Sequence, residues 1–226
     1  MKINDIFQHY ERWATAHGFP LSNIINDGTT SIHNSIGAVT DFQLALKTHN
    51  IDEDILVVAG DMLFDENALD ISQVIRYFHN IRDKYNGNLS IYYEMENNED
   101  ASTRGIVEID ELENGKITSL FEKPADSSIT SSRLASVVFY CLTRDTLPRI
   151  DDYLEAHTDI KERGFGCFVN WAIRNGTPFY GMKIPTRFQL IGNGQILIFE
   201  PIFAMAYLKF QTLFLRNTKI EIFAIF

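Results

Sequence analysis

A continuous apolar run, DILVVAG at residues 54–60, constrains the fold more than any other segment of this chain. Its branched side chains without polar alternation are typical of a β-strand that is covered on both faces. A helix is expected over residues 71–81, because Ile71, Val74, Ile75, Phe78 and Ile81 share one side, and a strand is expected at 88–93. Strand, helix and strand in this order predict a βαβ unit.

The other elements predict an α/β domain with a mixed sheet. Helices are expected at 3–16, 37–48, near 143–156 and at 167–174, and strands at 23–26, 134–142 and 179–184. Two further strands, GIVEID and KITSLFEKP, are joined by a turn at 113–115 and predict a hairpin that extends the sheet.

The last part of the chain differs from the rest. Residues 1–193 are expected to form the domain, whereas residues 194–226 form an atypical hydrophobic tail that we expect to be foreign to it. Glu200 and Lys209 interrupt the tail, and a charge within a membrane span costs about 2.5–3.5 kcal/mol. Membrane insertion is therefore disfavoured.

Charge and cysteine content narrow the function classes. Twenty Lys and Arg against thirty Asp and Glu give a net charge of −10, which disfavours nucleic-acid binding but leaves a small phosphorylated ligand open. The two cysteines lack the spacing of a metal or redox motif, and the N-terminal residues resemble an amphipathic helix, not a signal peptide. A reduced, cytoplasmic location is expected.

Two strand ends carry candidate site residues. Asp61 directly follows the DILVVAG strand, and ligands of open α/β sheets lie beyond the carboxyl ends of strands. Its carboxylate could bind Mg²⁺, although a helix cap or turn is the commoner role for one such aspartate. Lys123, between Glu122 and Pro124 at the end of KITSLFEKP, could direct its ammonium at a phosphate, or belong to an ordinary charge pair.

Glycines mark two further candidates. Gly105 opens the GIVEID strand and could let a ligand approach the backbone, or simply form a turn. The loop at residues 26–31, together with Gly37 and Ala38, could surround a nucleobase or phosphate with amides and hydroxyls, or consist of turn residues alone.

Taken in order, these segments resemble the sugar-1-phosphate nucleotidyltransferases, the nucleoside-diphosphate-sugar pyrophosphorylases that include glucose-1-phosphate thymidylyltransferases. The resemblance covers about residues 3–193 and rests on IINDGTTS, GA with Asp41, ILVVAGDMLFD, GIVEID, LFEKP and the G-x-F-x-x-W motif at Gly166 to Trp171. It implies a GT-A-like, Rossmann-related fold, and a role in nucleotide-sugar biosynthesis in which NTP and sugar 1-phosphate give NDP-sugar and pyrophosphate.

The resemblance also implies roles for single residues. Asp61 would bind Mg²⁺ and Lys123 the sugar phosphate, and both would be catalytic. Glu122 would lie near the sugar hydroxyls, and the backbone of Gly105 would pack against the sugar. The nucleotide base would lie beside a further motif, Gly37 and Ala38. The sugar-phosphate oxygen would attack the α-phosphorus directly, with no covalent intermediate.

Two departures from the family pattern bear on activity. The family begins with a strand and a glycine-rich loop that hold the triphosphate, and the chain is expected to start after them. Leu190 stands where the family has a second Mg²⁺-binding aspartate, and an apolar side chain supplies no oxygen ligand. An impaired or inactive chain is therefore expected, as a homo-oligomer or paired with an active homologue. The alternative is a non-catalytic regulatory subunit that binds sugar phosphate or nucleotide.

Overall fold

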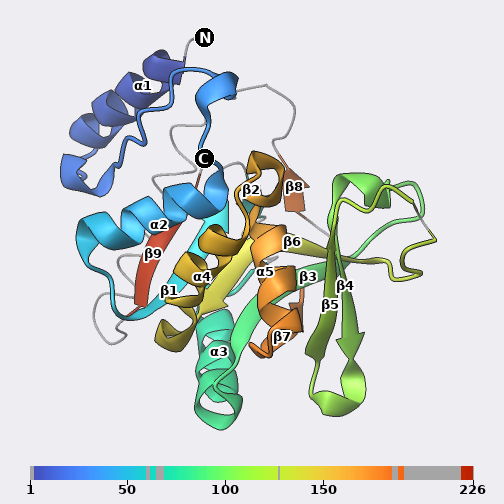
Figure 1. The fold of residues 1–226 in the computed structure, drawn as a ribbon. Helices are drawn as coiled ribbons and strands as arrows, with labels where there is room; N and C mark the ends of the chain where they lie inside the picture. The colour runs from blue at the N-terminus through green and yellow to red at the C-terminus, as the bar shows by residue number, and fades with distance from the viewer. Residues whose placement is uncertain are drawn as a thin grey trace.

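The computed structural model describes residues 3–59, 62–64, 69–126, 128–184, 188–190 and 220–225. Within these ranges a mixed sheet of seven strands, in the order β3-β7-β5-β4-β6-β1-β9, is covered by helices (Figure 1). The helices are α1 Ile3–Ala16, α2 Ala38–His49, α3 Ile71–Tyr85, α4 Arg149–Ala156 and α5 Phe165–Arg174. The α/β fold class predicted from the sequence is confirmed.

Six of the described strands were predicted from the sequence, whereas β2, β8 and β9 were not. The strands are β1 Asp54–Ala59, β2 Met62–Phe64, β3 Asn88–Glu94, β4 Gly105–Asp110, β5 Lys116–Glu122, β6 Leu134–Leu142, β7 Phe179–Lys183, β8 Phe188–Leu190 and β9 Ile220–Ile225. The predicted strand at 23–26 is wrong, because a 3₁₀ turn ends at residue 23 and irregular backbone follows. This apolar stretch is too short for its pattern to separate a strand from a loop.

The βαβ unit consists of β1, α3 and β3. Asp70 caps α3 by accepting the backbone N–H groups of Ser72 and Gln73 at 2.9 and 3.3 Å, and Asn86 ends the helix in the left-handed conformation. Both strands pair antiparallel with β6, on its opposite edges, so they run parallel to each other with β6 between them. The neighbours of β6 on both edges, β1 and β3, are therefore distant from it in the sequence.

The apolar run of β1 is buried on both faces of the sheet, as its composition predicts. Ile55 and Val57 belong to a cluster with residues of α2, α4 and α5, whereas Leu56 belongs to a second cluster with residues of α3. All three side chains are fully buried. Alternation along a strand sends successive side chains to opposite faces, and helices cover both (Figure 1).

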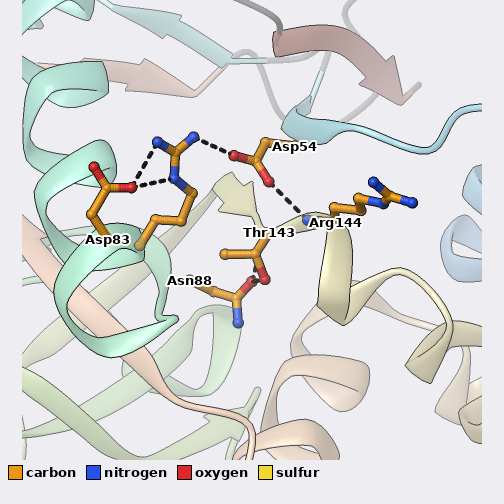
Figure 2. A network of polar contacts seen from close by, with 6 residues as sticks. Asp54, Asp83, Asn88, Thr143 and Arg144 are labelled. Carbon is orange, nitrogen blue, oxygen red and sulfur yellow. Dashed lines mark hydrogen bonds and ion pairs between the residues drawn. The ribbon is translucent and has the colours of Figure 1, made fainter.

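Polar contacts hold the amino-terminal end of β1 in place (Figure 2). Asp54 accepts one hydrogen bond from Arg82 Nη1 at 2.7 Å and another from the backbone N–H of Arg144 at 2.9 Å. Close by, the fully buried Asn88 accepts the backbone N–H of Thr143 at 2.9 Å. These contacts join β1 and β3 to the end of α3 and to the segment after β6. They lie at the amino-terminal ends of β1 and β3, away from the candidate site.

The expected tail lies partly outside the described residues, which leave out 191–219 and 226. Its strand β9 pairs in parallel with β1, from Asp54 opposite Ile220 to Ala59 opposite Ile225. The division of the chain at residue 193 remains a prediction. Among the described residues no helix is both long and apolar enough to cross a membrane.

Candidate functional site

The sheet places two predicted site residues, Gly105 and Glu122, beyond the carboxyl end of β1. Val58 of β1 pairs with Phe139 of β6, and Gly105 of β4 pairs with Ser136 of the same strand. β6 pairs with β3 along one side, and with both β1 and β4 along its other side. β4 therefore begins just beyond the point where β1 ends. Glu122, the last residue of β5, pairs with Gly105.

Asp61 falls in the chain just after this end of β1 but lies outside the described residues. The short strands β2 and β8 pair so that Leu190 lies opposite Met62, the residue that follows Asp61. In the part of the chain that the structure describes, no three His, Cys, Asp or Glu side chains gather as a metal site would require.

The Glu122 carboxylate packs between two glycines. A Cβ atom placed on Gly105 would lie 3.2 Å from Glu122 Oε2, and one placed on Gly166 of α5 would lie only 1.8 Å from it. The side chain is 30% exposed, and burial raises the pKa of this carboxyl group, an effect that Lys123 partly offsets. No described residue donates a hydrogen bond to this carboxylate, so it is an acceptor that a ligand could use.

Lys123 leaves the strand in an uncommon conformation. Its φ of 46° is left-handed although it is not glycine, which costs about 1–3 kcal/mol, and its backbone N–H donates to Arg104 O at 2.9 Å. Nζ lies 3.9 Å from Glu122 Oε1, and the side chain is 65% exposed. A strained backbone therefore holds an exposed ammonium beside the Glu122 carboxylate.

The predicted base-side residues, Gly37 and Ala38, form the start of α2. Only four residues, 50–53, connect α2 to β1, so the helix and the strand run in opposite directions. The first turn of α2 therefore lies near the carboxyl end of β1. Gly37 has a φ of 87°, and a Cβ atom there would lie 2.6 Å from Arg163 Cβ. Residues 163–166 therefore contact the start of α2 at one end and Glu122 at the other.

Two features of this region were not foreseen from the sequence. Gly166 belongs to a motif that the resemblance includes, but nothing in the sequence connects it with Glu122. Asp41, in the first turn of α2, forms a hydrogen bond with the Asp27 carboxyl group, and burial together with repulsion by Asp27 raises the pKa of Asp41 to about 6. Its Oδ1 atom is buried and has no hydrogen-bond partner among the described residues. Sequence spacing alone cannot reveal either contact.

The chain is similar to a known protein family in sequence and to several solved structures in fold. The nucleotidyl transferase family model matches residues 7–175. No curated protein sequence matches the chain significantly. Among solved structures, apo UDP-glucose pyrophosphorylase matches with a TM-score of 0.56 and 19% identity, over 78% of this chain and 62% of that one. The enzyme complexed with UDP-glucose matches with a TM-score of 0.53 and 19% identity, over 78% and 64%.

A third structure is described as a glucose-1-phosphate thymidylyltransferase from Bacillus anthracis in complex with sucrose. It matches with a TM-score of 0.53 and 17% identity, over 71% of this chain and 58% of that one. At these identities the likeness shows a common fold. The chain spans less than two thirds of the length of each of the three structures.

Proposed function

Because this chain belongs to the nucleotidyl transferase family, we propose that Glu122 and Lys123 bind a sugar 1-phosphate for reaction with a nucleoside triphosphate. The products would be NDP-sugar and pyrophosphate. The observation that carries the proposal is the Glu122 carboxylate, which lies between two glycines without a hydrogen-bond donor among the described residues, beside the ammonium of Lys123. A ligand that carries both hydroxyl groups and a phosphate would satisfy both side chains.

Each side chain has a distinct task in this proposal. Glu122 accepts a sugar hydroxyl and so fixes the orientation of the ring, while Gly105 lets the sugar approach the strand backbone. Lys123 offsets the negative charge of the sugar phosphate, which would otherwise repel the triphosphate that it must attack. Gly37 and Ala38 lie beside the nucleotide base. Holding the two anions in line converts their encounter into an intramolecular step.

The metal prediction rests on Asp61, which lies outside the described residues. Mg²⁺ prefers oxygen ligands in octahedral geometry, and Leu190, opposite the neighbour of Asp61, offers no side-chain oxygen. The described residues do not supply a set of ligands that fits the ion, so no step of the proposed reaction is assigned to it. This mismatch is also the reason to propose that the chain turns over slowly or not at all.

A second candidate function follows from Leu190. A subunit that binds sugar phosphate or nucleotide without reacting it, paired with an active homologue or a second copy, needs Glu122 and Lys123 but not the second metal ligand. A pyrophosphate-release assay with several NTP and sugar 1-phosphate pairs separates the two candidates. Little or no turnover is expected from this chain alone, and turnover at an ordinary enzymatic rate would contradict the impairment.

Calorimetric titration with glucose 1-phosphate tests the binding itself. Loss of one charge-assisted contact costs about 1.5–3 kcal/mol, so Lys123→Met should weaken binding by about 10–100-fold. Lys84→Met is the matched control, because Lys84 lies in the last turn of α3, beside the opposite edge of the sheet. Equal affinity of the Lys123→Met variant and the unaltered protein would refute the assignment of Lys123. Absence of binding by the unaltered protein would refute the proposal that Glu122 and Lys123 form a sugar-phosphate site.

A further inference from the structure

The contact between Gly166 and Glu122 is the closest approach at any glycine that the structure describes. A Cβ atom on Gly166 would lie 1.8 Å from Glu122 Oε2, 2.8 Å from Glu122 Cδ and 3.2 Å from Leu120 Cδ2. Real Cβ atoms do not approach other heavy atoms to less than 3.0 Å. Any side chain at position 166 would therefore displace the Glu122 carboxylate.

The backbone conformation gives no other reason for a glycine at this position. Gly166 lies in the first turn of α5 and is not among the residues with a positive φ, so alanine could adopt the same conformation. Glycine also destabilises a helix relative to alanine. Gly164, which precedes α5, differs in its surroundings, because no heavy atom lies within 4 Å of the position that its Cβ would take. Gly166 instead leaves room for the Glu122 side chain, which fills the space that a Cβ atom would need.

We propose that Gly166 is a positioning residue, whose missing side chain holds the Glu122 carboxylate in place for a hydroxyl group of the ligand. Oε2 lies against Gly105 and Gly166, while Oε1 faces Lys123 Nζ at 3.9 Å. The two glycines thus direct one oxygen and the lysine the other, which orients the carboxylate. The inference rests on the proposed function in one respect, namely that the donor belongs to a sugar phosphate.

Displacing the carboxylate is expected to change binding more than folding. Oε2 and Cδ are at the end of a flexible side chain, which can turn into solvent without moving the strand. The displaced carboxylate would then be hydrated, and its pKa would fall because the burial that raises it is lost. Shortening the side chain with Glu122→Asp removes the collision at its source, so an alanine at 166 should have little effect in that background.

The experiment compares four variants: Gly166→Ala, Gly164→Ala, Glu122→Asp and the double variant Gly166→Ala/Glu122→Asp. Gly166→Ala should weaken glucose 1-phosphate binding by about tenfold or more, the loss of one good hydrogen bond to a charged group, and Gly164→Ala should leave it unchanged. In the Glu122→Asp background the alanine should cost less than about threefold, because interacting sites are not additive. Thermal unfolding verifies that each variant is folded.

A second measurement needs no ligand. Carbon-detected NMR titration of the Glu122 carboxyl group should show a lower pKa in Gly166→Ala and no change in Gly164→Ala. An unchanged Glu122 pKa together with unchanged affinity in Gly166→Ala would overturn the inference, as would an equal loss in the Glu122→Asp background. If the pKa falls but the unaltered protein binds no glucose 1-phosphate, the contact stands and the proposed ligand is wrong.

Discussion

Replacing Asp41 with asparagine tests whether a contact between two carboxyl groups makes the stability of this domain depend on pH. The Asp41 carboxyl group hydrogen-bonds with that of Asp27 in the loop before α2. Asp27 also accepts the backbone N–H of Thr29 at 2.8 Å, which fixes its position. Burial, and then repulsion by Asp27, raise the pKa of Asp41 from 3.8 to about 6.

The free energy of unfolding should fall as the pH rises, because the pKa of Asp41 is higher in the folded state than in the unfolded state. Below pH 3.8 the group is protonated in both states, and as the pH rises toward 6 the unfolded chain loses its proton first, so the free energy of unfolding falls. A rise from 3.8 to about 6 corresponds to about 3 kcal/mol, which screening at this half-buried group reduces to about 1–2 kcal/mol. The positive end of α2 favours the charge by about 0.3–1 kcal/mol, too little to reverse the sign.

Urea unfolding of the Asp41→Asn variant and the unaltered protein measures the difference. Asparagine keeps the shape, can donate to Asp27 and carries no charge, so the variant should be more stable by about 1–2 kcal/mol at about pH 8 and nearly equal at about pH 4. Asp151→Asn is a control of opposite sign, because Lys47 lowers the pKa of Asp151 and removing that carboxylate should lower stability at the higher pH. An Asp41→Asn variant that is less stable at about pH 8, or whose advantage does not change with pH, would refute the reasoning.

Three further substitutions have defined outcomes. Asp54→Ala removes the 2.7 Å contact of Arg82 with Asp54, which leaves Arg82, among the described residues, only its ion pair with the exposed Asp83. It should lower the free energy of unfolding by about 2–3 kcal/mol in urea titration, more than loss of an exposed ion pair would. Gly37→Ala should cost about 1–3 kcal/mol by thermal unfolding, because a left-handed φ is combined with a Cβ only 2.6 Å from that of Arg163; a neutral result would contradict the packing. Lys123→Gly should relieve a φ of 46° and raise stability by about 1 kcal/mol while it weakens glucose 1-phosphate binding, and calorimetry with unfolding separates the two effects.

Local patterns were sufficient to predict most of the secondary structure. The apolar run of β1 and the spacing of Val74 and Phe78 in α3 are set by residues close together in the chain, and such periodicity is readable in a sequence. The order of motifs was sufficient to predict the family, and the site residues named from it lie, where they are described, along one edge of the sheet. Their chemical roles remain predictions that the binding and turnover experiments test.

The sequence by itself determined most of the segments that become helices and strands, because those preferences depend on neighbours within a few residues. Only the tertiary structure decided that β6 lies between β1 and β3, that Glu122 rests against Gly166, and that Asp27 meets Asp41. Each of these contacts joins elements that fold side by side, and its energy comes from packing and desolvation that exist only once the sheet has formed. Contacts of this kind cannot be predicted from a short stretch of sequence.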